Sequence, residues 1–209
     1  MQNIIITGAS HGIGRALTKK LSKKYHIINI DIVENKMDKV DFYKCDLSDK
    51  SKLLKTIEKI KTNIDSLYAL INNAALFSSK SLEKQTLEEW ENIISINLTA
   101  PYILSKEFAS MLKQSKGHII NISSTRASMS EAGTEAYSSS KGGISSLTHA
   151  LAITLSPDVK VNSISPGWIN TNEEYLPTKV DNEQHPSGRV GIPDDIVDTV
   201  KFLLKNRGF

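Results

Sequence analysis

The sequence lacks most of the features that mark secreted and membrane proteins. Its 209 residues include a single cysteine, Cys45, so no disulfide can form within the chain, and a reducing compartment is favoured. No apolar run approaches the roughly 20 residues that a membrane-spanning helix needs. Neither a charged leader nor a cleavage site precedes the strand-like run at Ile4. We therefore expect a cytoplasmic protein.

The sequence also lacks an excess of charge of one sign. There are 26 basic and 23 acidic residues, and the lysines are scattered among the acids rather than collected in one stripe. This pattern is typical of a solvated surface, so we expect no nucleic-acid partner and no membrane partner. We also expect no metal site. With 39% hydrophobic and 23% charged residues, the chain is long enough for one soluble domain with a sizeable core.

Strand-like and helix-like segments alternate along the chain, without a break in composition or an internal repeat. This order predicts one α/β domain over residues 1–209, with a three-layer, doubly wound parallel sheet. The predicted strands are 3–7, 26–30, 40–45, 67–71, 117–124 and 160–164. The predicted helices are 15–24, 48–62, 82–94, 97–115, 137–156 and 193–204, with Ser48 as an N-cap and Pro193 at a first helical position. The polar stretch 172–190 predicts a loop or short helix that acts as a substrate lid.

A glycine-rich turn follows the first strand. It reads GASHGIG over residues 8–14 and leads directly into a helix. Glycines let the backbone approach a pyrophosphate, and the free N–H groups of the helix N-terminus then face the anion. This predicts a dinucleotide site, against the alternative of a tight turn that binds nothing. The GK[ST] ending of a P-loop is absent, which argues against an NTPase.

An acidic residue, Asp31, ends the second strand. A carboxylate at this point can accept hydrogen bonds from both hydroxyls of an adenosine ribose and repels a 2′-phosphate. Within residues 8–15 only Arg15 could pair with such a phosphate. We therefore favour NAD over NADP, while the alternative is a loop aspartate that caps the next turn.

A tyrosine and a lysine, Tyr137 and Lys141, stand four residues apart on a predicted helix and so share one face. A phenol has a pKa of about 10 and is a poor proton donor and acceptor at neutral pH. One ammonium group about 4 Å away supplies roughly the energy needed to lower that pKa toward 7. The pair suits a general acid and its tuning group, although this spacing also occurs by chance on many helices.

Other polar residues lie at the carboxyl ends of the predicted strands, where open α/β sheets bind ligands. They are the run 72–75 (NNAA), the hydroxyls of Ser123 and Ser124, and the run 166–171 (PGWINT). Asn97 stands near the start of a predicted helix, where an amide side chain either caps the helix or holds a water.

With these motifs in order, the chain resembles a short-chain dehydrogenase/reductase, whose fold is of the Rossmann type. The cofactor loop of that family is similar to residues 7–14, and its Asn-Asn-Ala-Gly motif to residues 72–75, with Ala75 in place of glycine. Its catalytic tetrad matches Asn97, Ser124, Tyr137 and Lys141. Ser124 rather than Ser123 is the match, because it lies thirteen residues before Tyr137.

The resemblance implies an NAD(P)-dependent oxidoreductase that transfers hydride reversibly between a nicotinamide and a secondary alcohol or ketone. Tyr137 would be the general acid and base, Lys141 would lower the Tyr137 pKa and hold the nicotinamide ribose, Ser124 would bind the substrate oxygen, and Asn97 would position a water. The implied cofactor residues are Gly8, Ser10, Gly12, Ile13, Gly14, Asp31, Asp46, Leu47, Asn73, Ala74, Tyr137, Lys141, Pro166, Gly167, Ile169 and Thr171. The family also implies a homodimer or homotetramer.

The sequence departs from the family in two places. The family's branch continues past the last helix into a seventh strand, whereas this chain ends at Arg207-Gly208-Phe209, so we expect that strand to be absent. The sequence leaves open whether the chain is naturally short or lacks its end. The second departure is Arg126, where small apolar residues are common. It either helps to bind an acidic or polar substrate or is simply an exposed loop residue.

The sequence alone is also compatible with other functions. The main alternative is a dinucleotide sensor of the same fold without catalysis, which has no need of Tyr137 with Lys141. A sugar epimerase or dehydratase shares the Tyr-x-x-x-Lys pattern but needs a larger C-terminal domain. A methyltransferase shares the sheet and glycine-rich loop but not the tetrad. The identity of the substrate does not follow from the sequence.

Overall fold

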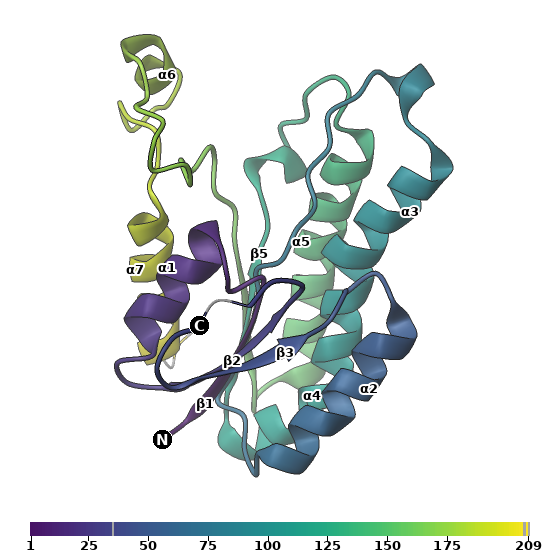
Figure 1. Cartoon of the computed structure of the whole chain (residues 1–209), viewed down its shortest axis with the longest axis vertical. Coiled ribbons are helices and arrows are strands. Elements are labelled where there is room, and N and C mark those ends of the chain that lie inside the picture. Colours follow the sequence, from purple (N-terminus) through teal and green to yellow (C-terminus); the bar gives the residue numbers. More distant parts are fainter. Residues whose placement is uncertain (35, 207, 209) are drawn as a thin grey trace.

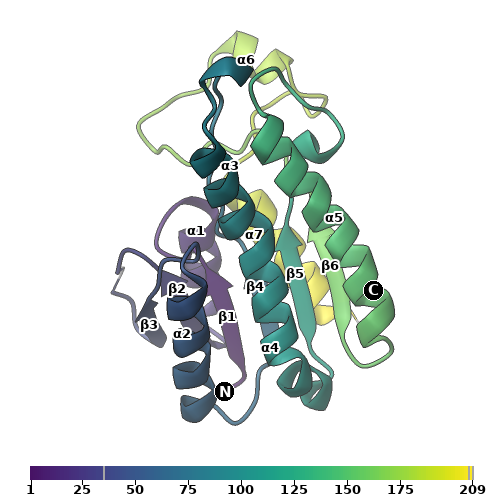
Figure 2. The same cartoon turned by 90° about the vertical axis from the view of Figure 1, so that its right-hand side faces the viewer.

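A single parallel sheet organises the molecule. The computed structural model describes residues 1–34, 36–206 and 208, and within them a six-stranded sheet has the order β3-β2-β1-β4-β5-β6 (Figures 1 and 2). Every neighbouring pair is parallel. The strands are β1 (Asn3–Thr7), β2 (His26–Asp31), β3 (Val40–Lys44), β4 (Ala69–Asn72), β5 (His118–Ile122) and β6 (Lys160–Ile164). The predicted α/β class and doubly wound sheet are confirmed.

Helices cover both faces of this sheet. The α-helices are α1 (Gly12–Leu21), α2 (Lys50–Asn63), α3 (Leu87–Ile94), α4 (Ala100–Ser115), α5 (Glu135–Leu155), α6 (Lys179–Glu183) and α7 (Pro193–Lys205). Figure 1 shows α1 and α7 side by side on one face and α2, α4 and α5 on the other. Three short helical segments complete the part of the chain that the structure describes. η1 (Leu82–Lys84) and η3 (Thr125–Ala127) are 3₁₀ turns, and η2 (Ser95–Thr99) is π-helical.

The isoleucine-rich strands divide the core into two clusters because alternate side chains point to opposite faces. In β1, Ile5 belongs to the cluster under α2 and α4, whereas Ile4 and Ile6 belong to the cluster under α1 and α7. All three side chains are fully buried. The continuous apolar strands are therefore explained by a sheet that is covered on both sides.

The topology places a ligand site at one edge. From β1 the chain builds β2 and β3 on one side, and it then returns to build β4, β5 and β6 on the other. The crevice at the carboxyl ends of β1 and β4 is thus the point where the strand order reverses, which is where open α/β sheets bind ligands.

Several predicted boundaries differ from the structure. The expected N-cap Ser48 is replaced by Asp49, whose carboxylate accepts a hydrogen bond from the Lys52 N–H at 3.0 Å. The helix expected over 82–94 is split, because Thr86 caps a new start with a capping box. The helix expected to begin at Asn97 is instead continuous with α3 through η2. Pro193 does open α7, as predicted.

The predicted lid, residues 172–190, contains the short helix α6. Thr178 caps it, and the Asp181 carboxylate accepts hydrogen bonds from the backbone N–H of Thr178 and from the Tyr175 hydroxyl. At the chain end, Asn206 and Gly208 lie outside any strand. Arg207 and Phe209, which the sequence analysis named at that end, lie outside the described residues.

Candidate active site

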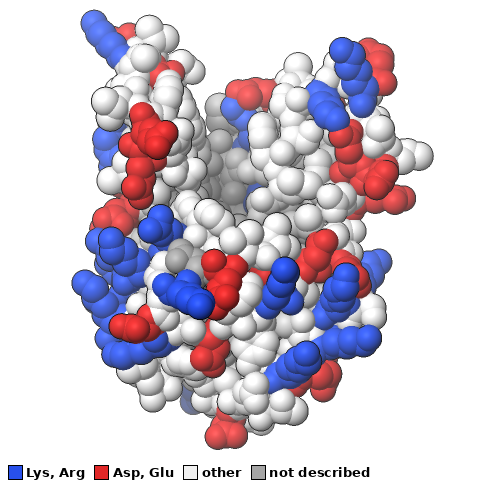
Figure 3. Space-filling view, in the orientation of Figure 1, with Lys and Arg blue, Asp and Glu red and all other residues white. Residues whose placement is uncertain are grey.

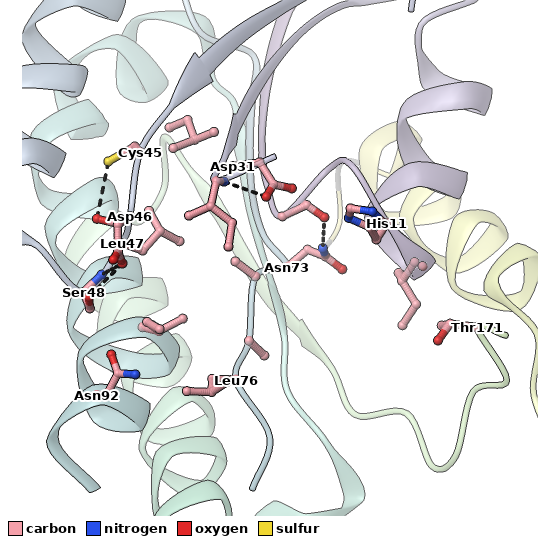
Figure 4. A pocket seen from close by; sticks show the side chains of 18 residues that line it. His11, Asp31, Cys45, Asp46, Leu47, Ser48, Asn73, Leu76, Asn92 and Thr171 are labelled. Carbon is pink, nitrogen blue, oxygen red and sulfur yellow. Dashed lines mark hydrogen bonds between the residues drawn. The ribbon is translucent and has the colours of Figure 1, made fainter. Parts of the chain in front are cut away.

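A cavity of about 660 Å³ lies at the carboxyl ends of β1, β2 and β4 (Figure 4). Nine of the predicted cofactor residues line it: Gly8, Gly12, Ile13, Asp31, Asp46, Leu47, Asn73, Ala74 and Thr171. In Figure 4, Asp46 and Leu47 lie on one side of Asp31, and Thr171 lies on the other. The structure therefore gathers residues from four strand ends around one space.

The cavity wall also contains residues that the sequence did not predict as part of the cofactor site. They are His11, Ile30, Ile32, Cys45, Ser48, Ala75, Leu76, Asn92 and Ile96. Most of them adjoin a predicted residue along the chain, so adjacency could have suggested them. Ile96 precedes the predicted catalytic residue Asn97, whereas Asn92 has no such signal, because only the packing of α3 beside the strand ends brings it to the wall.

Seven predicted cofactor residues do not line this cavity: Ser10, Gly14, Tyr137, Lys141, Pro166, Gly167 and Ile169. Ser10 is buried and shapes the turn, since its hydroxyl donates to the Val33 carbonyl at 2.5 Å. The Pro166 carbonyl accepts a hydrogen bond from the Thr125 N–H at 2.9 Å, and Ile169 forms a bridge with Gly191. These contacts fix the loop after β6 to its neighbours.

The glycine-rich turn has a geometry that only glycine allows at two positions. Gly8 has a φ of +65°, a left-handed conformation that side chains disfavour. A Cβ on Gly14 would lie 2.0 Å from the Gly8 carbonyl oxygen, so α1 starts in direct contact with the turn. A backbone this close, with a helix N-terminus beside it, fits the pyrophosphate of a dinucleotide.

Asp31 is fixed in place by backbone N–H groups. One carboxylate oxygen accepts from the Ser10 N–H at 3.0 Å, and the other accepts from Ile32 at 2.7 Å and Val33 at 3.2 Å. The side chain thus both caps the loop after β2, as the alternative interpretation held, and lines the cavity. A carboxylate oxygen has more than one acceptor site, so these bonds leave room for a ligand hydroxyl.

The four predicted catalytic residues come from three different parts of the chain. Tyr137 and Lys141 lie in α5, Ser124 lies two residues after the end of β5, and Asn97 lies in η2. The Ser124 side chain interacts with the Tyr137 phenol and lowers the Tyr137 pKa. None of the four lines the cavity at β1 and β4, so they form a second, adjoining part of the same sheet edge.

Ser123 and Ser124 have different partners. The Ser123 hydroxyl donates to the Lys141 carbonyl at 3.1 Å and lies 3.2 Å from the Ser145 hydroxyl, so it joins β5 to α5. The Ser124 hydroxyl instead accepts a hydrogen bond from the Arg126 N–H at 3.2 Å, and it lowers the Tyr137 pKa. The structure therefore places Ser124, rather than Ser123, beside the tyrosine.

Burial dominates the electrostatics of this part. It raises the pKa of Tyr137 above its ordinary value, and the Ser124 side chain and the Arg126 charge oppose that rise. The Tyr137 pKa is thus raised, whereas we expected Lys141 to lower it. Burial also lowers the pKa of Lys141 to about 8. The Lys141 ammonium donates to the Ile122 carbonyl at 2.7 Å and lies 5.6 Å from the centre of the Tyr137 ring.

Asn97 connects three segments through its buried amide. Its Oδ1 accepts from the Leu76 N–H at 2.8 Å, and its Nδ2 donates to the Leu76 carbonyl and to the Ser140 hydroxyl, both at 3.0 Å. The Ser140 hydroxyl in turn donates to the Tyr137 carbonyl at 2.7 Å. Asn97 is thus linked to the backbone of Tyr137 through one side chain.

Figure 3 shows a hollow between the part of the molecule that carries α6 and the part that carries α3 and α5.

Among the described residues, no group of three or more His, Cys, Asp or Glu side chains is arranged to hold a metal ion. The helices of the described ranges also include none that is long and apolar enough to cross a membrane.

Comparison with known proteins identifies the family. A family model described as short chain dehydrogenase matches residues 2–175. The chain belongs to this family. It is 42% identical to an uncharacterized oxidoreductase of Thermotoga maritima, in an alignment that covers 95% of this chain and 86% of the relative. The short-chain dehydrogenase family binds a nicotinamide dinucleotide, and this chain is an oxidoreductase of that family.

Solved structures of similar proteins share the fold. An apo SCOR enzyme from Clostridium thermocellum superposes with a TM-score of 0.92 at 39% identity, covering 100% of this chain and 88% of that one. A 4-hydroxyisoleucine dehydrogenase complexed with NADH superposes with a TM-score of 0.90 at 31% identity, covering 100% and 93%. The short-chain dehydrogenase fold thus extends over the whole chain.

Proposed function

We propose that this short-chain dehydrogenase is an NAD-dependent oxidoreductase that transfers hydride reversibly between the nicotinamide and a secondary alcohol or ketone, with Tyr137 as general acid and base. The observation that carries the proposal is that the Lys141 ammonium lies 5.6 Å from the centre of the Tyr137 ring, while Ser124 acts on the pKa of the same phenol. At the sheet edge beside the cavity, Tyr137 would thus be the proton donor, Ser124 would bind the substrate oxygen, and Lys141 would supply a positive charge.

The cavity wall suits the adenosine half of the cofactor. Asp31 would accept hydrogen bonds from the ribose, Asp46 and Leu47 would border the adenine, and the turn at Gly8 and Gly12 would face the phosphates. When bound, the cofactor supplies or accepts the hydride. Pro166, Gly167, Ile169 and Thr171 follow β6, where Thr171 packs against Gly12, and we assign this loop to the nicotinamide side.

Each catalytic side chain has a physical role in this proposal. The raised pKa keeps the Tyr137 phenol protonated at neutral pH, so it can donate a proton to the oxygen of a ketone. Ser124 would donate a hydrogen bond to the same oxygen and stabilise its developing charge. Lys141, with a pKa of about 8, is mostly charged at pH 7 and favours the phenolate that forms. Asn97 would be a positioning residue for α5.

Substitution of the tyrosine separates the proposed enzyme from a non-catalytic dinucleotide sensor. Tyr137→Phe removes only the hydroxyl, so we expect turnover of a secondary alcohol to fall by at least about 100-fold, the usual contribution of general acid–base catalysis. NADH affinity, measured by calorimetry, should change little. Undiminished turnover in the variant would contradict the assignment of Tyr137.

The preference for NAD rests on Asp31, which lines the cavity and carries a negative charge where NADP has its 2′-phosphate. The similar 4-hydroxyisoleucine dehydrogenase, which was solved with NADH, supports it, and its name indicates an activity on a hydroxyl group. We expect NADH to bind at least about tenfold more tightly than NADPH, a difference of roughly 1.4 kcal/mol. Quenching of Trp90 and Trp168 fluorescence measures both affinities. Tighter binding of NADPH would refute the Asp31 argument and leave the reaction class untouched.

We also assign residues 172–190 as a substrate lid over a single domain of residues 1–209. Trp168 contacts two aromatic rings of this segment, Tyr175 at 5.8 Å and His185 at 6.1 Å between ring centres. These contacts support a segment anchored beside the loop after β6. A cytoplasmic location and a homodimer or homotetramer remain predictions of the sequence.

A further inference from the structure

Arg126 lies closer to the proposed catalytic groups than its loop position suggests. It belongs to η3, two residues after Ser124, and its backbone N–H donates to the Ser124 hydroxyl at 3.2 Å. The next contact of the loop, from the Thr125 N–H to the Pro166 carbonyl, holds η3 against the segment after β6. The Arg126 charge also lowers the Tyr137 pKa.

The guanidinium is held in place but is not saturated. One of its nitrogens donates to the Met129 carbonyl at 3.1 Å, and another pairs with the Glu131 carboxylate. A guanidinium has five N–H donors, more than these two acceptors from the described residues use. The Arg126 side chain is 29% exposed and that of Glu131 is 59% exposed. The cation therefore sits partly buried, while its carboxylate partner reaches it from solvent.

This arrangement leaves Glu131 exchangeable. Exposed ion pairs contribute little to stability, because both ions are well solvated when apart. A ligand carboxylate can make the same planar, two-pronged contact with a guanidinium that the Glu131 carboxylate can make. A ligand carboxylate can therefore compete with Glu131 for the Arg126 guanidinium.

We propose that the substrate is a hydroxy or oxo carboxylic acid whose carboxylate takes the place of Glu131 on the Arg126 guanidinium. This rests on the proposed function, because the alcohol or ketone carbon must lie at Ser124 and Tyr137. Arg126 then determines specificity by binding the far end of the substrate, while Glu131 keeps the cation paired until a carboxylate arrives.

Paired substrates test the proposal. Oxidation of 3-hydroxybutyrate and reduction of 4-oxopentanoate would each be compared with the corresponding methyl ester. We expect the wild-type kcat/KM to favour the acid, and Arg126→Ala to lower the acid-to-ester ratio at least about tenfold, mostly through KM. Arg126→Lys should give an intermediate ratio, since a lysine keeps the charge but loses the planar contact. Glu131→Gln should lower KM for the acid.

A control variant and a binding measurement complete the test. Lys201→Ala removes a cation from an exposed ion pair with Asp198 on α7 and should leave the acid-to-ester ratio unchanged. Butyrate binding to the NADH-loaded protein, followed by NADH fluorescence, gives a readout without turnover. Arg126→Ala should weaken the binding of butyrate at least about tenfold more than it weakens the binding of methyl butyrate.

The outcomes separate this inference from the proposed function. An acid-to-ester ratio and a butyrate affinity that are the same in wild type and Arg126→Ala would overturn the carboxylate assignment, even if Tyr137→Phe abolishes turnover of the esters. Turnover that survives Tyr137→Phe would instead overturn the catalytic proposal. Thermal unfolding of each variant shows that a changed ratio does not come from a misfolded protein.

Discussion

At the scale of single residues, Lys141 stands out because it is a buried cation. Lys141 is 2% exposed, and its ammonium donates a hydrogen bond to the Ile122 carbonyl. Burial lowers its pKa from 10.5 to about 8. Since each pKa unit corresponds to 1.36 kcal/mol, keeping this lysine charged in the folded state at pH 7 costs about 3 kcal/mol. Such a cost is expected where a residue serves function rather than stability.

Replacing Lys141 by methionine should therefore stabilise the protein and abolish its activity. The folded state binds fewer protons than the unfolded state between pH 8 and 10.5, so the wild type gains stability as the pH rises through that window. We expect Lys141→Met to be more stable by about 2 kcal/mol at pH 7, allowing roughly 1 kcal/mol for the lost hydrogen bond. Urea unfolding at pH 7, 8.5 and 9.5 should show this advantage shrinking.

The exposed Lys113, in the last turn of α4, provides the matched control. Lys113→Met changes the same atoms without a buried charge, so its stability relative to wild type should not vary with pH in this window. If Lys141→Met lost stability at pH 7, or if both variants followed the same pH dependence, the burial of a charged lysine would not be the cause.

At the scale of elements, η2 is the segment that positions the candidate site. A π-helical turn between α3 and α4 carries Asn97, and π-helical turns of this kind are frequent at functional sites. Asn97 bonds the segment after β4 and, through the Ser140 hydroxyl, the backbone carbonyl of Tyr137. The position of Tyr137 thus depends on η2, on the segment after β4 and on the Ser140 side chain.

Loss of the Ser140 hydroxyl should lower the catalytic rate without affecting substrate binding. Ser140→Ala breaks the bonds to Asn97 and to the Tyr137 carbonyl, and one hydrogen bond of about 1 kcal/mol corresponds to a roughly five- to tenfold lower kcat. KM should stay within about twofold of wild type. Ser139→Ala, on the exposed side of the same helix, is the control and should change neither constant. Equal effects of the two substitutions would contradict this role.

The sequence predicts the elements better than their junctions. The isoleucine runs and the glycine-rich turn are local patterns, and β6 begins and ends as predicted because Val161 and its neighbours lie between clear turn residues. The junction at Asn97 could not be predicted, because a π-helical turn depends on packing between α3, α4 and α5 rather than on a local pattern. The same limit explains why Asn92 was missed at the cavity wall.

The pKa of Tyr137 shows the same limit for chemistry. A Tyr-x-x-x-Lys spacing indicates that two side chains share a helix face, but it contains no information about how deeply they are buried. In the structure burial dominates, raising the pKa of Tyr137 and lowering that of Lys141. The direction of a pKa shift thus follows from the spacing of two charges only when the desolvation of both groups is also known.

At the scale of the whole molecule, two core clusters lie on opposite faces of one sheet. Leu17 of α1 belongs to one cluster and Leu104 of α4 to the other, and both side chains are fully buried. Every strand of the sheet between them has residues that point to both faces, so neither cluster can open without exposing the other. We therefore expect the domain to unfold as one cooperative unit.

Matched leucine substitutions test this cooperativity. Leu17→Ala and Leu104→Ala should each destabilise the protein by about 2–5 kcal/mol, the usual range for a buried leucine. Each should shift the whole calorimetric transition rather than split it. NADH at about 100 times its Kd should raise the stability of both variants by roughly 2.7 kcal/mol, because a ligand bound only to the folded state stabilises every part that unfolds with its site. Two resolved transitions, of which NADH moves only one, would show that the faces unfold separately and that the cavity at β1 and β4 is stabilised by one cluster alone.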